Sequence, residues 1–324
     1  MIKNSLPVLV QMDPLENINF NSDSTISIIE EGLKRGHNIF FCRPQDIFIS
    51  SQRKKIRCKK FKFKNSGVTI SNNFSEYEYS HFKVIFLRQD PPFDISYVTN
   101  LHLHMVQREL TNINNIFFIN SPLGILRFSE KLYALDYPEI TPKTDILNEL
   151  EDIKKFIRKN KKIVIKPLYD KGGSGVTLIE KLDKNSVERI AALTKNFTQK
   201  IVVQKFISKV SRGDKRVLLI DGKPVGAINR VPSPGSFKAN LHLGAQAKKT
   251  KLSKTELSIC KKISPSLKRN GLFFVGIDII DNKLTEINVT SPTGITQINH
   301  IDKVSIQKTL WQQIEKKTQF KAKS

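Results

Sequence analysis

The chain has 324 residues, 39% of them hydrophobic and 26% charged, a composition typical of a globular protein with two or three subdomains. The sequence excludes a membrane-spanning helix, since no stretch approaches the roughly 20 apolar residues required. Its three cysteines are scattered, which excludes a disulfide framework, so we expect a cytoplasmic protein. The net charge of +24 would be consistent with binding to a nucleic acid or to an anionic membrane. The excess of positive charge is mostly lysine spread along the whole chain, however. This distribution favours solvated basic surfaces over a binding site for nucleic acid or membrane.

The first elements in chain order predict an open α/β domain. The apolar run Leu6–Gln11 is typical of a buried strand. Asp23 or Ser24 can cap the helix that follows, and Gly36 can end it in the left-handed conformation. Asn38–Cys42 is the next apolar run, so strand, helix and strand follow one another at the spacing of an α/β unit.

The densest basic segment is Arg53–Lys64, in which Phe61 and Phe63 alternate with lysines. A nucleic-acid-binding interpretation would use the aromatic rings for base stacking. Alternation with a period of two fits a half-buried strand better, and lysines commonly protect the edge of a sheet. We therefore predict an edge strand here.

The remaining patterns divide the chain into three parts. A strand at Val84–Leu87, a helix at Val98–Leu110 and a strand at Ile116–Ile119 complete the first part. The predicted parts are residues 1–121, an N-terminal α/β domain, residues 122–200, a central segment, and residues 201–324, a C-terminal segment. In the last two we expect strands at Ile163–Lys166, Val176–Ile179, Ile201–Gln204, Arg216–Ile220, Val225–Asn229, Phe273–Ile280 and Leu284–Val289, and a helix at Lys254–Arg269.

A hairpin near the end of the chain carries the first candidate site. Asp278 interrupts an apolar strand, where an uncompensated carboxylate would be costly. After a turn at Asp281-Asn282, the return strand carries Glu286 and Asn288, which share one face because they are two residues apart. Two carboxylates and an amide oxygen suit magnesium bound together with nucleotide phosphates. The alternative is a pair of acids on a solvated hairpin, which the apolar surroundings of Asp278 disfavour.

A glycine-rich loop forms the second motif. It follows a strand that ends at Lys166 and contains Gly172, Gly173, Ser174 and Gly175. Glycines let backbone N–H groups approach a phosphate closely. The spacing is neither a Walker A loop nor a dinucleotide fingerprint, because no helix begins there. Glycine-rich hairpins are common, so the loop points to a nucleotide only in combination with the metal ligands downstream.

Fixed positive charges and a long loop complete the chemistry. Lys131, Lys166, Arg216 and Arg230 could neutralise a transferred phosphate, although a single lysine in so basic a chain is more often a surface residue. Residues 230–248 are polar and punctuated by proline and glycine, as in a lid that excludes water or in an ordinary surface loop.

These motifs, in this order, resemble the ATP-grasp family. The resemblance implies an α/β protein in which an N-terminal open α/β domain precedes two α+β subdomains that hold ATP between them. It implies nucleotide contacts from Lys131, Lys166, Gly172, Gly173, Ser174, Gly175, Gln204, Lys205, Phe206, Ile207 and Asp214. It also implies two Mg²⁺ or Mn²⁺ ions held by Asp278, Glu286 and Asn288.

Three further motifs resemble the bacterial glutathione synthetases within that family: Met12-Asp13-Pro14 with Asn19, Arg88–Asp94 and Leu284–Pro292. The first two lie outside the shared nucleotide fold, so they discriminate among its members. The resemblance implies ATP-dependent joining of γ-glutamylcysteine and glycine through an acyl phosphate, in a homo-oligomer, with Arg216 and Arg230 as catalytic cations. Substrate contacts would come from Asp13, Asn19, Arg88, Asp90, Lys238, Asn240, Ser291 and Pro292.

Three positions depart from this pattern. Members of the family usually have Arg in place of Lys238, Gly in place of Ala245 and Arg in place of Thr296. Lysine cannot bind a carboxylate through two parallel hydrogen bonds as arginine does. A related ligase with a different amine acceptor therefore stays open as an alternative, and a non-catalytic basic binding protein is a more distant one.

Overall fold

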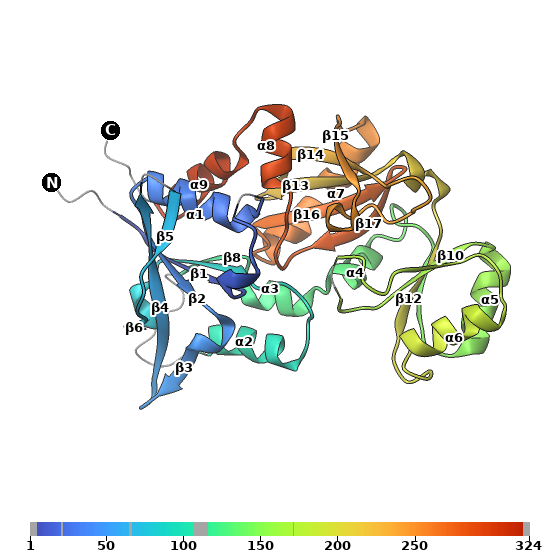
Figure 1. Cartoon of the computed structure of the whole chain (residues 1–324), viewed down its shortest axis with the longest axis horizontal. Coiled ribbons are helices and arrows are strands. Elements are labelled where there is room, and N and C mark those ends of the chain that lie inside the picture. The colour runs from blue at the N-terminus through green and yellow to red at the C-terminus, as the bar shows by residue number, and fades with distance from the viewer. Residues whose placement is uncertain (1–4, 21, 65–66, 107–115, 171, 320–324) are drawn as a thin grey trace.

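The computed structural model describes residues 5–20, 22–64, 67–106, 116–170 and 172–319. Within these residues the strands form three sheets, of eight, four and five strands. In Figure 1 the eight-stranded N-terminal sheet lies at the left, the four-stranded central sheet at the right, and the five-stranded C-terminal sheet between them.

The N-terminal sheet has a parallel centre in the order β2-β1-β7-β8. Helix α1 (Ser24–Lys34) connects the first two of its strands, and the Asp23 carboxylate caps it by accepting from the backbone N–H groups of Thr25 and Ile26. The predicted strand–helix–strand unit is therefore confirmed. The strands are β1 (Pro7–Met12), β2 (Asn38–Cys42), β7 (Val84–Arg88) and β8 (Phe117–Ile119).

Strand β4 (Arg53–Lys64) has the predicted bounds, but the prediction that it is an edge strand was wrong. It pairs with β2 on one side, and with β3 (Ile47–Ser50), β5 (Gly67–Ile70) and β6 (Ser75–Glu78) along its length. Ile56 and Cys58, on one side of the pleat, are buried, whereas Arg57 on the other side is exposed. Phe61 is buried in the core, whereas Phe63 is 46% exposed.

Short helices lead from this sheet to the rest of the molecule. The helix predicted at Val98–Leu110 is α2 (Ile95–Met105), and residues 107–110 lie outside the described residues. Helices α3 (Pro122–Arg127) and α4 (Glu130–Tyr133) follow β8. Single 3₁₀ turns occur at Leu15–Asn17, Pro44–Asp46, Tyr79–His81, Ala134–Asp136, Ser208–Arg212 and Leu241–Leu243.

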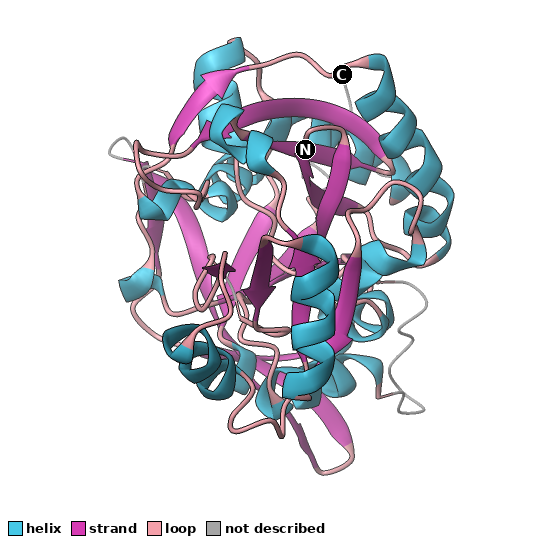
Figure 2. Cartoon of the chain, turned by 90° about the vertical axis from the view of Figure 1, so that its right-hand side faces the viewer, coloured by secondary structure: helices cyan, strands magenta, loops and turns pink. Residues whose placement is uncertain are grey.

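The central sheet is antiparallel, in the order β11-β10-β12-β9, and packs against helices α5 (Leu150–Asn160) and α6 (Lys184–Leu193) through apolar side chains. Figure 2 turns this end of the molecule toward the viewer. Because β12 pairs with β10 and β9, the sheet extends to Lys205, past the boundary expected at residue 200. Its strands are β9 (Thr144–Leu147), β10 (Ile163–Lys166), β11 (Thr177–Ile179) and β12 (Ile201–Lys205).

The C-terminal sheet is also antiparallel, in the order β15-β14-β13-β16-β17. Helix α7 (Lys254–Arg269) has the predicted bounds and begins with a capping box between Ser253 and Glu256. The strands are β13 (Asp214–Ile220), β14 (Lys223–Val231), β15 (Gln246–Lys249), β16 (Phe274–Ile280) and β17 (Lys283–Asn288).

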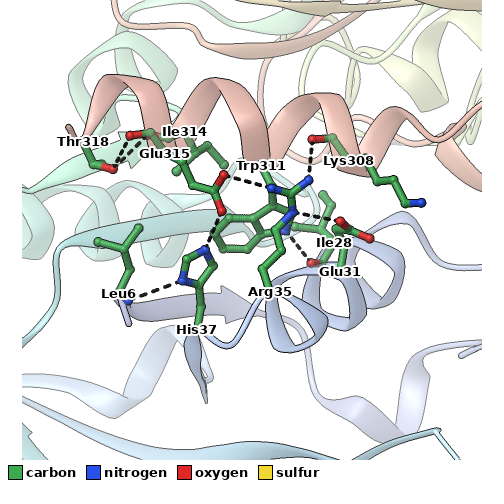
Figure 3. A network of polar contacts seen from close by, with 10 residues as sticks. All are labelled: Leu6, Ile28, Glu31, Arg35, His37, Lys308, Trp311, Ile314, Glu315 and Thr318. Carbon is green, nitrogen blue, oxygen red and sulfur yellow. Dashed lines mark hydrogen bonds and ion pairs between the residues drawn. The ribbon is translucent and has the colours of Figure 1, made fainter. Parts of the chain in front are cut away.

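The last two helices, α8 (Ile295–Asp302) and α9 (Ile306–Lys317), were not predicted. Helix α9 returns to the N-terminal domain and lies beside α1 (Figure 1). The indole N–H of Trp311 donates to the Ile28 carbonyl at 2.8 Å, and Figure 3 shows Arg35 between the carboxylates of Glu31 and Glu315. A side chain at position 32 would collide with the Trp311 ring, so Gly32 permits this contact. The two ends of the described chain are thus packed together.

Candidate functional site

Two adjoining cavities open where the three sheets meet. The first, of about 240 Å³, lies between the central and C-terminal sheets. It is lined by most of the residues predicted to bind nucleotide and metal: Lys131, Lys166, Gly172, Gly173, Ser174, Gln204, Lys205, Phe206, Ile207, Asp214, Asp278, Glu286 and Asn288. Gly175 does not line it, because this residue packs against Pro167 and Leu193. We call this the nucleotide cavity.

The second cavity, of about 1040 Å³, lies against the N-terminal domain, and we call it the peptide cavity. The substrate residues predicted from the first motifs all line it, namely Asp13, Asn19, Arg88 and Asp90. Asp90, Asn240, Ser291, Arg216 and Arg230 line both cavities, and Lys238 lines only the nucleotide cavity. Pro292 lines neither, but its carbonyl accepts a hydrogen bond from Arg88. The geometry therefore brings the sequence-predicted residues to one continuous site.

The β16–β17 hairpin positions the predicted metal ligands. Asp278 is directly opposite Glu286 in the ladder, and Asn288 lies beside both. The Asp281-Asn282 turn has positive φ at both residues, which suits a two-residue hairpin. Among the described residues, no group of three His, Cys, Asp or Glu side chains is placed to hold a metal ion on its own. The hairpin itself offers two carboxylates and one amide oxygen to the cavity.

Two arginines hold Asp278. Arg216 Nε donates to Oδ1 at 2.6 Å and its Nη2 to Oδ2 at 3.0 Å, while Arg230 Nη2 lies 2.9 Å from Oδ1. Burial alone would raise the pKa of Asp278, but the two guanidinium groups outweigh it and hold the pKa well below its ordinary value. Asp278 is thus ionised at neutral pH and fixes both catalytic candidates in place.

The ion pair between Asp214 and Arg230 leaves one polar atom of each side chain without a hydrogen-bond partner among the described residues. Arg230 Nη2 donates to Asp214 Oδ2 at 2.6 Å, whereas Asp214 Oδ1 and Arg230 Nε are buried without a hydrogen-bond partner among the described residues. Burial raises the pKa of Asp214 to about 6, although Arg230 opposes the shift. Because buried polar groups are normally paired, an acceptor and a donor left together in a cavity fit a polar ligand.

The lysines lie across from the hairpin. Lys131 Nζ donates to the Asp170 carbonyl at 2.6 Å and lies 3.5 Å from Glu286 Oε1. Lys166 ends β10 at the same cavity, where burial lowers its pKa although Glu286 opposes the shift. Two ammonium groups that face a carboxylate can neutralise an anionic phosphate held between them.

Residues 232–245, between β14 and β15, lie against the glycine-rich loop, and the predicted lid segment 230–248 thus begins and ends within strands. A Cβ atom at Gly173 would lie 3.4 Å from Leu243 Cδ1, and one at Gly172 would lie 3.8 Å from Asn240 Nδ2. Both glycines have positive φ, which few other residues adopt. At the far end of the cavity, Phe237 meets Phe206 edge to face at 6.1 Å. The loop therefore covers the nucleotide cavity from the glycine loop to the β12 strand end.

Arg88 is the most deeply buried charge of the peptide cavity, at 3% exposure. Its Nε donates to Thr25 Oγ1 at 3.1 Å and its Nη1 to the Pro292 carbonyl at 3.0 Å. Its Nη2 is buried without a hydrogen-bond partner among the described residues, and burial lowers the pKa of the guanidinium group. A ligand carboxylate would supply the missing acceptor.

Sequence reasoning missed several residues that shape the site. Glu130 lines the nucleotide cavity and accepts from Thr290, and burial followed by the nearby Glu286 charge raises its pKa. Its only signal was that it precedes Lys131. Ser24 and Thr25, at the start of α1, carried no signal beyond helix capping, because their partners lie far along the chain.

Comparison with known proteins decides the family. Residues 6–125 match the model of the prokaryotic glutathione synthetase N-terminal domain, and residues 130–303 match that of the prokaryotic glutathione synthetase ATP-grasp domain. The chain belongs to the prokaryotic glutathione synthetase family. Glutathione synthetases from Brucella melitensis and Agrobacterium fabrum are each 36% identical to it, over 96% of this chain and 99% and 96% of their own.

Solved structures agree on the fold of this glutathione synthetase family member. An ATP-grasp ligase, PsnB, superposes with a TM-score of 0.63 at 15% identity, over 98% of this chain and 99% of its own. D-cycloserine synthetase DcsG superposes with a TM-score of 0.61 at 14% identity, over 88% and 92%. The predicted fold, an α/β domain followed by an ATP-grasp fold, is confirmed. Within the described residues, no helix is long and apolar enough to cross a membrane.

Proposed function

We propose that this chain is a glutathione synthetase, which joins γ-glutamylcysteine to glycine with conversion of ATP to ADP and phosphate. The observation that carries the proposal is the junction of the two cavities at Ser291, Arg216 and Arg230. One cavity has the charges for a nucleotide, and the other has a buried guanidinium for a peptide carboxylate. A ligase needs both ligands side by side, because the phosphate must pass from one to the other.

In the first step, the cysteinyl carboxylate oxygen attacks the γ-phosphorus, the bond to the β-phosphate oxygen breaks, and ADP leaves. We propose that Lys131 and Lys166 neutralise the moving phosphate, and that Gln204–Ile207 hold the adenine. Magnesium, bound by Glu286, Asn288 and the shared carboxylate of Asp278, would supply charge neutralisation on the phosphate oxygens. Hard oxygen ligands on one hairpin face fit this ion.

In the second step, the amine of glycine attacks the carbonyl carbon of the acyl phosphate, and inorganic phosphate leaves. Arg230 is positioned by Asp214 and Asp278, and we propose that its unpaired Nε donates to the oxyanion that forms. The loop over the glycine loop would exclude water, which would otherwise hydrolyse the acyl phosphate. No enzyme nucleophile is required, and the three cysteines are buried away from both cavities.

The peptide substrate would lie in the second cavity. Arg88 Nη2 is proposed to bind one of its carboxylates, with Asp13, Asn19 and Asp90 close by for its ammonium group. We also propose that the protein acts in the cytoplasm as a homo-oligomer, with neither nucleic acid nor membrane as a partner. Size-exclusion chromatography with light scattering would test the oligomeric state.

The experiment that tests the function is measurement of ADP release with Mg²⁺, γ-glutamylcysteine and glycine, with glutathione identified by mass spectrometry. Turnover only with another amine would favour the related ligase. Lys238, Ala245 and Thr296 are the positions that support that alternative, and Thr296 Oγ1 donates to the Ser22 carbonyl at the rim of the peptide cavity. Absence of turnover with every amine would favour a binding protein.

A further inference from the structure

The segment between β17 and α8, residues 289–294, separates the two cavities. Ser291 and Thr293 line both of them, and Thr290 lines the nucleotide cavity. The segment contains neither helix nor strand, so no regular hydrogen-bond ladder fixes its backbone. Asn288, a candidate metal ligand, lies immediately before it. Any displacement of the segment would therefore move a metal ligand and the wall of the peptide cavity together.

Side chains from distant elements hold the main chain of this segment instead. The Ser24 hydroxyl oxygen accepts from the N–H groups of Gly294 at 3.1 Å and Ile295 at 3.2 Å. In the other contacts a side chain donates to a backbone carbonyl: Asn120 to Val289 at 2.7 Å, Arg88 to Pro292 at 3.0 Å and Arg216 to Thr293 at 3.3 Å. The position of the segment is thus set by tertiary contacts.

Glu130 holds Thr290, another residue of this segment. Its Oε1 accepts from Thr290 Oγ1 at 2.6 Å and from the Thr290 backbone N–H at 3.3 Å. The next residue of the same short helix, Lys131, reaches Glu286 on β17. We infer that Glu130 is a positioning residue that holds Thr290, and with it Asn288 and Ser291, in the geometry that metal and peptide binding require.

The contacts of Glu130 distinguish a positioning role from a role as general base or direct metal ligand. Both contacts of Glu130 are made by one oxygen that accepts hydrogen bonds, a task that an amide oxygen also performs. A general base or a direct metal ligand would need the negative charge. Replacement by glutamine therefore keeps the hydrogen bonds to Thr290 but would abolish a role as general base or metal ligand. Replacement by alanine would remove both.

The test measures Mn²⁺ binding to the full chain in the presence of ADP, by electron paramagnetic resonance and without turnover. Glu130→Ala is expected to weaken Mn²⁺ binding about tenfold, and Thr290→Val, which keeps the side-chain shape, about threefold. Glu130→Gln should stay within about threefold of the parent protein, and ADP binding without metal should not change in any variant. Glu139→Ala is the matched control, since Glu139 is a surface residue paired with Lys262.

The inference also predicts a split in kinetics, which rests on the proposed function. Glu130→Ala should raise the KM for γ-glutamylcysteine about tenfold with little change in the KM for ATP, and Glu130→Gln should restore it. The inference would be overturned if Glu130→Ala bound Mn²⁺ as tightly as the parent protein. It would also be overturned if Glu130→Gln lost as much Mn²⁺ affinity as Glu130→Ala. Because the Mn²⁺ measurement uses no peptide or amine, failure of the proposed reaction would leave it interpretable. Thr290→Val carries the test if the alanine variant does not fold.

Discussion

The two cavities of the molecule are built in different ways. In the nucleotide cavity, Glu286 and Asn288 lie two residues apart on one strand, and the glycine-rich loop is continuous in sequence. In the peptide cavity, the central contact joins Thr25, Arg88 and Pro292, which meet only through packing of the N-terminal domain against the C-terminal sheet. Local spacing determines the first site, whereas domain packing determines the second.

This difference predicts different consequences of substitution. In the proposed reaction, the nucleotide cavity would neutralise charge that develops as the phosphate moves, so we expect the residues that bind the phosphate and the metal to act mainly on kcat. The peptide cavity would hold fixed charges of a ground-state substrate, so we expect the residues that bind the peptide to act mainly on KM. Arg216 and Arg230 line both cavities and should affect both constants.

The largest effect is expected at the metal hairpin. Glu286→Gln should lower kcat about 1,000-fold or more, because an amide is a poor substitute for a charged magnesium ligand. The circular dichroism spectrum should not change, since Glu286 is partly exposed at the cavity. Steady-state kinetics with coupled ADP detection would measure the loss, with Glu139→Gln as the control. Near-normal turnover would remove Glu286 from the metal site.

Substitution of Arg88 should affect binding in the peptide cavity without affecting binding in the nucleotide cavity. Arg88→Lys is expected to raise the KM for γ-glutamylcysteine about 30-fold, since an ammonium group cannot reproduce the planar forked geometry with which the guanidinium group would contact Thr25, Pro292 and a ligand carboxylate. The KM for ATP should change less than about threefold. Arg127→Lys, on the exposed side of α3, is the control. A uniform loss in kcat with an unchanged peptide KM would contradict the assignment of two separate cavities.

The same contrast explains which parts of the fold could be predicted. Helix α7 has the predicted bounds because its apolar periodicity and its Ser253–Glu256 capping box are local signals. Strand β10 has the predicted bounds because the three consecutive apolar residues Ile163–Ile165 lead directly to Lys166. The edge assignment of Arg53–Lys64 failed, since strand partners are not local. Helices α8 and α9 were missed because Trp311 packs on a helix nearly 300 residues earlier.

The candidate site divides in the same way. The hairpin ligands and the glycine loop were visible in the sequence as spacing. Glu130 was not, since its role depends on Thr290, 160 residues away. The unpaired atoms of Asp214, Arg230 and Arg88 were also invisible, because only the folded chain shows which polar groups are buried without partners.

A smaller effect, on stability, is expected inside the N-terminal domain, at Lys54 on β4. Lys54 is 1% exposed, and its ammonium group donates to the His104 carbonyl and lies 4.1 Å from the centre of the Tyr79 ring. Burial lowers the pKa of Lys54 to about 8 from an ordinary value of 10.5. The folded state therefore binds fewer protons than the unfolded state between these pH values, so stability from this group rises with pH and is lowest below pH 8.

Lys54→Met should accordingly increase the free energy of unfolding at pH 7 by about 1–2 kcal/mol, after allowance for the lost hydrogen bond. The increase should shrink as the pH rises toward 10.5 and beyond, because the lysine of the unfolded state then also loses its proton. Urea unfolding at pH 7 and pH 10 would measure it, with Lys55→Met, which removes a surface pair with Glu76, as the control. A variant less stable than the parent at pH 7 would show that the lysine contacts outweigh its burial.

The smallest effect concerns Lys238, in the loop that covers the nucleotide cavity, at a position where the family resemblance led us to expect arginine. Lys238→Arg should raise kcat/KM for glycine about threefold, because a guanidinium group can bind the glycine carboxylate through two parallel hydrogen bonds. Lys162→Arg, at a surface pair with Glu180, is the control. A fall in kcat/KM for glycine would instead mean that Lys238 is matched to a different acceptor. Competition between glycine and other amines in the parent protein would then identify the acceptor, so the residue that departs from the family pattern tests the substrate more directly than the residues that match it.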